Sequence, residues 1–455
     1  MKNKLNILIL SSKNPYHSAN LCFDALTALE QAGHKVDFIT RYKFENQKDN
    51  MINVEDSSFF FVVKKNIISS LSSLKRKYQK NIPLLKVVRK LFFPKTFNNY
   101  TRSNHGIFLA CLDEEKPPVN PLFILDKIKN KYDLIITFFW QNFITAKTLE
   151  VIYKETKIPI LIHPVDMFPM TGGCIYPDKC KRFYNACGCC PALNSTDKYD
   201  QTYNNFMYKK NVYSNINCAF YTNSYMLNMM KQSSMFQNAR LGFKSIILNE
   251  NVFCQQDIDL CRNYFNIPSN KKFILLARST RYIGAHDRKG MHYLIDSINV
   301  FCKNKSSRQL EDMLLILVGT NADDIESEIA MEVMNMGIVN TEDLIKLYSV
   351  SKLFLSPSVD DAGPSMVNQA LMCSTPCVTF EIGTAIDVID HEVNGYKAKL
   401  RDSIDFSHGI EYFFSLNDSD YHEKRKNARR IAMKFNSMKR YEEIVSEAYL
   451  KFTSC

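Results

Sequence analysis

The sequence has 455 residues, of which 45% are apolar and 23% are charged, with a formal net charge of +11. This composition is ordinary for a globular protein and allows a sizeable hydrophobic core that does not need disulfide bonds for stability. The length is too great for one ordinary domain and suits two domains of roughly 200 residues each.

The first residues do not resemble an export signal. Their apolar run, residues 5–10, is too short, and no cleavage site follows it. No stretch approaches about 18 consecutive apolar residues, so no segment is expected to cross a bilayer. We therefore expect a cytoplasmic protein, in which the 14 cysteines are thiols or metal ligands rather than a disulfide framework.

The excess positive charge is concentrated in residues 57–112, which contain no acidic residue. Eleven basic residues lie between Lys64 and Arg102, and the remaining 47 basic residues equal the 47 acidic ones. Apolar residues at helical spacing on both sides of Pro83 predict two short amphipathic helices. We predict that the 64–102 segment binds an anionic membrane surface. A solvated helical insertion is the alternative, and no nucleic acid is expected, because no aromatic stacking platform accompanies the charge.

Strand and helix patterns alternate along both halves of the chain. The first half predicts buried strands at residues 5–10, 36–40, 134–138 and 159–163, with helices at 18–31 and 144–155. The second half predicts strands at residues 273–277, 314–319, 353–356 and 376–380, with helical patterns between them. This alternation of strands and helices implies parallel sheets, which we expect to form two Rossmann-like α/β domains.

These patterns place an N-terminal domain at residues 1–245 and a C-terminal domain at residues 246–430. The basic insertion 57–112 and a cysteine-rich loop, residues 171–193, interrupt the first domain. A C-terminal helix is expected at residues 431–455.

The most specific stretch is residues 356–380, which read SPSVDDAGPSMVNQALMCSTPCVTF. A strand is predicted to end near Ser356, and a loop with Asp360 and Asp361 follows. Gly363 permits a tight turn, and Pro364 suits the first position of a helix over residues 365–373. Free N–H groups at a helix start bind diphosphates, and ligands of open α/β sheets bind at the carboxyl ends of strands.

This stretch resembles the donor-binding signature of glycosyltransferase family 4, retaining enzymes of the GT-B fold, in the branch that reads Asp-Ala-Gly-Pro…Asn-Gln. Asp361 and Gln369 stand where the signature has two glutamates, and Ser374 replaces its usual glycine. The resemblance implies two domains that face each other across a cleft, with the acceptor side in residues 1–245 and the nucleotide-sugar site in residues 246–430. It also implies that the helix at residues 431–455 crosses back to the first domain. It implies that Asp361 bonds hydroxyls of the donor sugar and that Gln369 bonds the nucleotide ribose. The backbone that faces the donor and its phosphates would be that of Gly363, Pro364, Ser365 and Met366.

Basic residues upstream fit the same site. Arg278 follows the strand at 273–277, and Arg288-Lys289-Gly290 precedes a helix predicted at residues 291–301. The resemblance implies that Lys289, with Arg288 or Arg278 as its partner, neutralises the donor diphosphate. Cations beside a leaving diphosphate stabilise the charge that develops as the glycosidic bond breaks. Lys289 and Asp361 are therefore candidate catalytic residues.

Asp166 and His163 follow the strand predicted at 159–163 and are expected to face the cleft between the domains. Asp166 is a third candidate catalytic residue, which would contact the acceptor or stabilise positive charge at the sugar. Capping of a turn is the alternative for Asp166, and His163 is expected to be structural. In the loop after the first strand, Tyr16-His-Ser-Ala19 stands where many relatives have Gly-Gly-Ala, so the backbone approaches a ligand less freely.

Four regularly spaced cysteines follow Asp166, namely Cys174, Cys180, Cys187 and Cys190. Four thiolates that end in a Cys-x-x-Cys pattern can hold one tetrahedral, structural zinc ion. Free thiols and disulfides are the alternatives. Catalysis itself is expected to need no cofactor.

The combined prediction is a retaining hexosyltransferase that moves a sugar from a UDP- or GDP-linked donor to a polysaccharide or lipid-linked acceptor. It would act at the inner face of the plasma membrane, in polysaccharide, lipopolysaccharide or capsule biosynthesis. A GT-B relative that hydrolyses or epimerises sugar nucleotides is a rival enzyme. A catalytically weak or dead binding subunit of a glycan-assembly complex is the rival outside enzymes, because the replaced glutamates would suit it.

Overall fold

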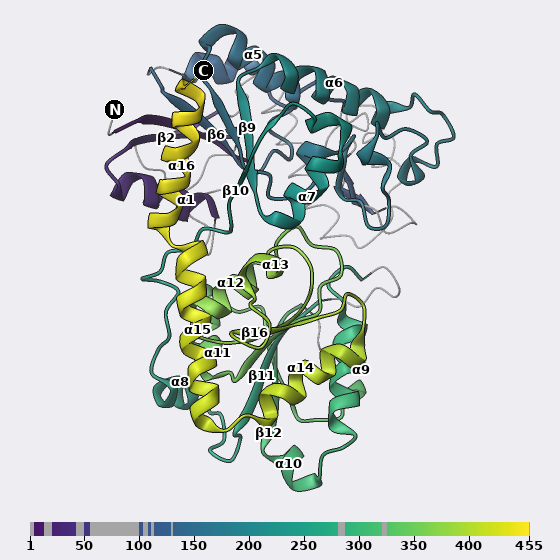
Figure 1. Ribbon diagram of the computed structural model, residues 1–455, viewed down its shortest axis with the longest axis vertical. Helices are drawn as coiled ribbons and strands as arrows, with labels where there is room; N and C mark the ends of the chain where they lie inside the picture. Colours follow the sequence, from purple (N-terminus) through teal and green to yellow (C-terminus); the bar gives the residue numbers. More distant parts are fainter. Residues whose placement is uncertain are drawn as a thin grey trace, which may run out of the picture.

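The computed structural model describes residues 4–12, 21–41, 50–54, 100–102, 108–110, 113–128, 131–280, 287–320 and 325–454. These residues form two parallel sheets with helices on both faces, one in the upper and one in the lower half of Figure 1. The predicted pair of Rossmann-like α/β domains is confirmed. The amphipathic helices predicted on either side of Pro83 and the loop with His17 lie outside the described residues.

The first sheet has the strand order β10-β9-β7-β6-β1-β2-β3, and all of its pairs are parallel. Its strands are β1 (Asn6–Leu10), β2 (Lys35–Thr40), β3 (Met51–Asn53), β6 (Leu134–Thr137), β7 (Ile160–Ile162), β9 (Cys218–Thr222) and β10 (Arg240–Phe243). Leu8 and Leu10 pack into one core, whereas Ile7 and Ile9 pack into another on the opposite face. Apolar residues on both faces of a strand are typical of a sheet that helices cover on both sides.

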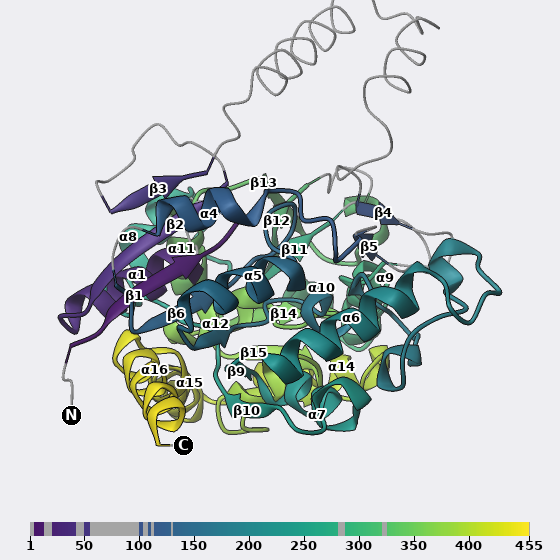
Figure 2. The same ribbon diagram turned by 90° about the horizontal axis from the view of Figure 1, so that it is seen from above.

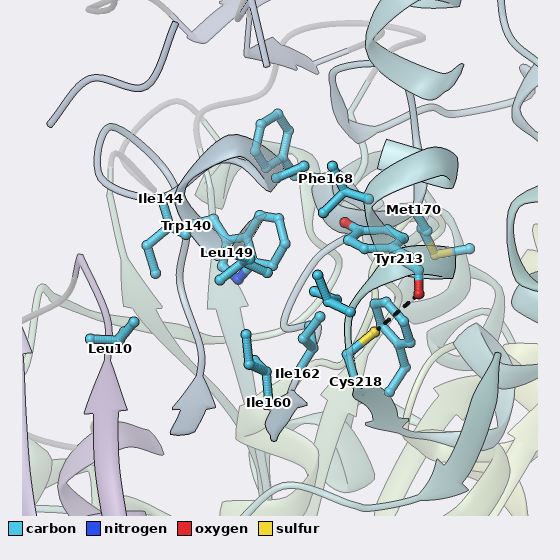
Figure 3. Packing of buried hydrophobic residues seen from close by; sticks show 14 of the residues in the cluster. Leu10, Trp140, Ile144, Leu149, Ile160, Ile162, Phe168, Met170, Tyr213 and Cys218 are labelled. Atoms are coloured by element: carbon cyan, nitrogen blue, oxygen red, sulfur yellow. Dashed lines mark hydrogen bonds between the residues drawn. The ribbon is translucent and has the colours of Figure 1, made fainter. Parts of the chain in front are cut away.

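Helices α4 (Pro121–Lys127), α5 (Ala146–Thr156), α6 (Gln201–Asn215) and α7 (Ser224–Gln232) belong to the first domain, together with α1 (Leu21–Gln31). Figure 3 shows the core on the α5 and α6 face, in which Trp140 and Leu149 lie near Phe168 and Tyr213. In this core the Cys218 thiol donates a hydrogen bond to the Tyr213 carbonyl oxygen over 3.7 Å. Short 3-10 helices lie in the loops of this domain, namely η1 (Phe168–Met170), η2 (Arg182–Tyr184), η3 (Pro191–Leu193) and η4 (Ser234–Phe236).

The second sheet has the strand order β13-β12-β11-β14-β15-β16, again with parallel pairs only. Its strands are β11 (Phe273–Ser279), β12 (Met313–Gly319), β13 (Val333–Gly337), β14 (Leu353–Ser356), β15 (Cys377–Phe380) and β16 (Gly395–Ala398). The strands predicted in this half of the sequence are therefore confirmed, because each buried run of aliphatic residues forms one.

The helices of this half are α8 (Ile258–Tyr264), α9 (Met291–Cys302), α10 (Ser307–Glu311), α11 (Thr341–Val350), α12 (Ser365–Met372), α13 (Ala385–Val388) and α14 (Ser403–Ser415), with η6 (Glu326–Glu328). Residues of α9 and α14 share one core, and residues of α11 and α12 share the core on the other face. In the part of the chain that the structure describes, no helix is both long enough and apolar enough to span a bilayer.

The last two helices, α15 (Asp418–Asn436) and α16 (Met438–Thr453), cover different domains. They run along one side of the molecule in Figures 1 and 2, and Ser437 separates them. Ala428 and Ala432 of α15 pack in the C-terminal domain, whereas Tyr441 and Val445 of α16 join the core of α1 and β1. The apolar stripe of α16 therefore completes the N-terminal domain.

The chain passes between the domains twice, near residue 245 and near residue 437. The Asn436 side chain connects these two segments. Its amide nitrogen donates to Ser245 Oγ over 3.0 Å and to Ile246 O over 2.6 Å. The same nitrogen lies 2.8 Å from Asn368 Oδ1 in α12. The two segments that connect the domains are thus hydrogen-bonded to each other and to α12.

A small antiparallel sheet joins the basic insertion to the cysteine-rich loop. Its strands are β4 (Tyr100–Arg102), β5 (Phe108–Ala110) and β8 (Cys174–Tyr176), in that order. The end of the 64–102 segment therefore lies next to the loop that carries the cysteines.

A buried ion pair between Lys209 of α6 and Glu114 stabilises the first domain. Lys209 Nζ lies 3.1 Å from Glu114 Oε1, and both side chains are fully buried. The ammonium also donates to the carbonyl oxygens of Phe168 and Thr171. Replacing Lys209 with Met should lower the free energy of unfolding by about 3–5 kcal/mol, because the Glu114 charge is then left buried without its partner.

Urea unfolding followed by fluorescence measures this loss, because the single Trp of the sequence, Trp140, is buried in the same domain. Lys147→Met is the control, since Lys147 forms a partly exposed pair with Glu150. Such a pair is worth about 0–1 kcal/mol. Equal losses for the two variants would contradict the assignment of a stabilising buried pair.

Candidate active site

Two loops of the second sheet meet at its carboxyl edge. One follows β14 and carries Asp360 and Asp361, and the other, residues 287–290, precedes α9. The Val359 N–H donates to the Arg288 carbonyl oxygen over 2.9 Å, which joins them. Gly290 has a φ of +71°, and a Cβ there would lie 1.9 Å from the Pro357 carbonyl oxygen. The two loops can approach this closely only because residue 290 has no side chain.

This contact between the loops places two predicted donor-site cations, Lys289 and Arg288, next to the predicted carboxylate of Asp361. Lys289 Nζ forms an ion pair with Asp361 Oδ2, and Arg288 lies 3.4 Å from the same oxygen. The other carboxylate oxygen of Asp361 accepts a hydrogen bond from the Gly363 N–H over 3.1 Å. Asp361 is only 4% exposed. A carboxylate with two cations and an amide donor stays ionised despite its burial.

The ionisation of this cluster follows from competing effects. Burial alone would raise the pKa of Asp361, but Lys289 and Arg288 outweigh it and hold the pKa below its ordinary value. Burial lowers the pKa of Lys289, although Asp361 opposes this change. The charge of Arg278, an exposed residue at the end of β11, also lowers the pKa of Lys289. Of the two arginines, Arg288 therefore contacts Asp361 beside Lys289, whereas Arg278 acts on the cluster through its charge.

The first turn of α12 begins beside this cluster. The helix begins at Ser365, as predicted, but Pro364 is its N-cap residue, with φ −67° and ψ 95°, and not its first helical residue. The extended ψ of Pro364 places it just outside the helix. Asn223 of the first domain donates from its side-chain amide to the Ala362 carbonyl oxygen and fixes the approach to this turn. Gln369, in the second turn, accepts a hydrogen bond from the Tyr348 hydroxyl over 3.2 Å.

The N-terminal domain brings Asp166 to its own carboxyl sheet edge, after β7. Asp166 Oδ1 accepts from the Phe168 N–H over 2.9 Å, and Oδ2 accepts from the side-chain amide of Gln141. Asp166 thus caps a turn and is also held by a buried amide from the loop after β6. His163 is completely buried, and its Nδ1 lies 3.1 Å from the Tyr221 carbonyl oxygen. This environment agrees with a structural His163.

Tyr176, at the end of β8, links the two halves of the site. Its ring lies against the Arg288 guanidinium, with Cζ 4.0 Å from the ring centre. Burial raises the pKa of Tyr176, Arg288 opposes the rise, and the charges of Asp361 and Asp166 add to it. The charges of predicted catalytic carboxylates from both domains therefore act on the same tyrosine. No sequence motif indicated Tyr176 or Gln141 as site residues.

A second link between the domains follows two residues after Tyr176. The Asp178 N–H donates to Asp360 Oδ2 over 3.1 Å, and the Asp178 carboxylate lies 3.4 Å from Arg401. Burial raises the pKa of Asp360 to about 6, against the lowering effect of the Asp178 amide. The cysteine-rich loop thus contacts the loop that carries Asp361.

The predicted zinc site at Cys174, Cys180, Cys187 and Cys190 is not supported. Cys180 packs against Cys174, but among the described residues no three His, Cys, Asp or Glu side chains are arranged to hold a metal ion. Every cysteine described is a free thiol. Hydrogen bonds to the start of α6 order the loop instead. In these bonds the Cys190 N–H donates to Asp200 over 2.8 Å and the Gly188 N–H to Thr202 over 3.1 Å.

The fold of the whole chain is similar to that of several solved proteins. Sucrose-phosphate synthase from Thermosynechococcus elongatus has a TM-score of 0.64 at 15% identity, over 99% of each chain. HepE from Anabaena in complex with UDP has a TM-score of 0.59 at 14% identity, over 98% of this chain and 100% of that one. TarM has a TM-score of 0.58 at 13% identity, over 99% of each chain. The chain therefore has the GT-B fold.

Residues 262–434 match the family model of the Glycosyl transferases group 1. An uncharacterized glycosyltransferase of Methanocaldococcus jannaschii is 25% identical over 141 residues, which cover 30% of this chain and 33% of that protein. The chain thus matches about a third of the length of this curated relative. The matched part of the chain is similar to glycosyl transferases of group 1, and it contains Lys289 and Asp361.

Gly290→Ala tests whether the close approach of the two loops builds the site. The new Cβ would collide with the Pro357 carbonyl and separate Arg288 and Lys289 from Asp361. Binding of UDP or GDP should fall at least tenfold in calorimetric titration. Gly337→Ala is the matched control, because Gly337 also has a positive φ of +61° but a Cβ there meets no atom within 4 Å. The control should lose about 1 kcal/mol of stability and no binding, so equal effects of the two variants would contradict the prediction.

The pH dependence of stability tests the buried Asp360. Because its pKa is raised to about 6, the folded protein holds this proton more tightly than the unfolded chain. Asp360 therefore contributes stability at low pH that is lost as the pH rises from about 4 through about 6. Asp360→Asn should match the wild type near pH 4 and exceed it by about 1–3 kcal/mol above pH 7.

Thermal unfolding across this pH range measures the difference between Asp360→Asn and the wild type. The control is Asp418→Asn, whose side chain is 96% exposed, so this change should alter stability little at any pH. A constant difference between wild type and Asp360→Asn across the range would refute the assignment.

Proposed function

We propose that the chain is a retaining hexosyltransferase that moves a sugar from a UDP- or GDP-linked donor to a polysaccharide or lipid-linked acceptor. The observation that carries the proposal is the cluster of Lys289, Arg288 and Asp361 beside the first turn of α12. Cations next to the free N–H groups of a helix start suit a diphosphate. The UDP in the structure of HepE, a protein of the same fold, supports a nucleotide-linked donor.

Lys289 and Arg288 neutralise the nucleoside diphosphate as it leaves. Two cations contact the carboxylate of Asp361, so positive charge is held where the diphosphate would bind. This arrangement is in place before the donor arrives, because Asp361 already fixes the Lys289 ammonium. Preorganised charge of this kind stabilises a transition state without further reorganisation.

Asp361 and Gln369 hold the sugar and the ribose of the donor. Oδ2 of Asp361 already accepts from Lys289 and Arg288, whereas Oδ1 accepts one hydrogen bond, from the Gly363 N–H, and has a second lone pair that can accept from a sugar hydroxyl. Gln369 accepts from Tyr348 through its oxygen, which leaves its amide group to donate to a ribose oxygen. The backbone from Gly363 to Met366 faces the phosphates.

In the transfer step, the bond between the anomeric carbon and the diphosphate oxygen breaks, and a bond to the acceptor oxygen forms on the same face. The acceptor proton passes to the leaving phosphate oxygen, so no separate general base is needed. Asp166 contacts the acceptor or stabilises the positive charge that develops at the sugar. Its hydrogen bond from Gln141 holds it for this role.

The acceptor is a glycan or lipid-linked glycan at the cytoplasmic face of the membrane. The support is the basic sequence of residues 64–102, where positive charges occur without acidic residues. Lys and Arg in such a segment each contribute about 1 kcal/mol to binding of an anionic lipid surface.

A nucleotide-sugar screen tests the donor. UDP- and GDP-sugars are added in turn, and the one that raises the unfolding temperature most is used in an assay of nucleotide release. Lys289→Met should lower kcat about 100-fold, as expected for the loss of one charge-stabilising group. Lys272→Met should keep wild-type activity, because Lys272 is 76% exposed. Wild-type protein that binds a nucleotide sugar but never releases the nucleotide would instead support a catalytically dead subunit.

Membrane binding is tested by sedimentation with vesicles that contain phosphatidylglycerol. Changing Lys75, Arg76, Lys77 and Lys80 to Gln should weaken binding at least tenfold at 0.1 M salt, because about four favourable charges are removed. Changing four exposed C-terminal-domain lysines and arginines to Gln controls for total charge. Equal binding by both variants would refute the membrane role of the basic segment.

A further inference from the structure

Tyr176 belongs to the N-terminal domain, yet its ring lies on a predicted donor-binding cation of the C-terminal domain. The Arg288 Cζ atom is 4.0 Å from the ring centre, which is close contact for a guanidinium over an aromatic face. Arg288 is the member of the Lys289–Arg288–Asp361 cluster that reaches the other domain. The aromatic ring and the cation cluster therefore form one unit across the domain boundary.

Stacking on a ring fixes the plane of a guanidinium without using its N–H groups, which lie along its edge. Two polar contacts of Arg288 in its own domain, to the Asp360 carbonyl and to Asp361 Oδ2, are both 3.4 Å long. These contacts hold the edge of the guanidinium. The flat ring of Tyr176 lies against its face and restrains it in the remaining direction.

The position of Tyr176 is itself fixed from both domains. On one side, Tyr176 pairs with Phe108 in the small sheet, and the carbonyl of the preceding residue, Ile175, accepts from the Met167 N–H over 3.1 Å. On the other side, Asp178 binds Asp360 and Arg401 of the C-terminal domain. The ring is therefore supported by the loop of Asp166 and by the loop of Asp361 together.

We propose that Tyr176 is a positioning residue, which the N-terminal domain supplies to orient Arg288 toward the diphosphate of the donor. The proposal rests on the proposed function, because it assigns Arg288 to the diphosphate. Donor binding then requires the two domains to hold the arrangement in which Tyr176 covers Arg288. The cysteine-rich loop gains a role as the support of a donor-site residue.

Calorimetric titration of the full-length protein with UDP and with GDP tests the proposal, using the nucleotide that binds the wild type more tightly. Tyr176→Phe keeps the aromatic face and should bind within about twofold of the wild type. Tyr176→Leu and Tyr176→Met keep apolar bulk without the aromatic face and should weaken binding about threefold to thirtyfold. Of Tyr176→Leu and Tyr176→Met, the variant whose unfolding midpoint stays at the wild-type value is used in the double-mutant cycle below. Tyr184→Leu is the control and should bind normally, because Tyr184 lies in the same loop but its ring packs in a tilted arrangement against Phe183.

A double-mutant cycle with Arg288→Ala separates positioning from a general structural effect. If Tyr176 acts through Arg288, its replacement should cause no further loss of binding, within about twofold, once Arg288 is absent. The same loss in both backgrounds, or wild-type binding by the variant without the ring, overturns the proposal. If the wild type binds neither nucleotide, the proposed function fails first, and this role of Tyr176 fails with it.

Discussion

The buried carboxylate of Asp361 is the group on which the geometry of the site depends. A charge that is removed from water needs partners, and Lys289, Arg288 and the Gly363 N–H provide them. The pair with Lys289 joins segments 72 residues apart in the sequence, so it fastens the turn before α9 to the loop after β14. Because Gly363 directly precedes Pro364, the N-cap of α12, the same carboxylate also fixes the position of the helix start.

The first domain reaches this centre through polar contacts. Asn223 binds the Ala362 carbonyl, the Ser224 N–H donates to Asp387 over 3.1 Å, and Asp178 binds Asp360. Domains of one chain that meet through polar contacts are able to move relative to each other. Formation of the complete site is therefore linked to the arrangement of the domains, because the Lys289–Arg288–Asp361 cluster comes from one domain and its aromatic cover from the other.

The parts of the structure that could be predicted from the sequence are those that depend on residues close together in the chain. Runs such as residues 5–10 and 314–319 predicted strands because apolar side chains on both faces require cover on both sides. Lys289 and Asp361 could be predicted to lie together because a family resemblance supplied the long-range information. Tyr176 and Gln141 could not, since their roles depend on where two distant loops end in space. The cysteine spacing suggested zinc because spacing does not reveal the backbone hydrogen bonds that order the loop.

The division of α15 and α16 at Ser437 has a consequence for the order in which the chain folds during synthesis. The apolar surface of α1 and β1 is closed by Met438, Tyr441, Ile444, Val445, Ala448 and Phe452, which leave the ribosome after the whole C-terminal domain. The N-terminal domain is thus made first but finishes its core last. A fragment that ends near residue 245 would keep an open apolar face, and the natural unit of folding includes both crossings of the chain.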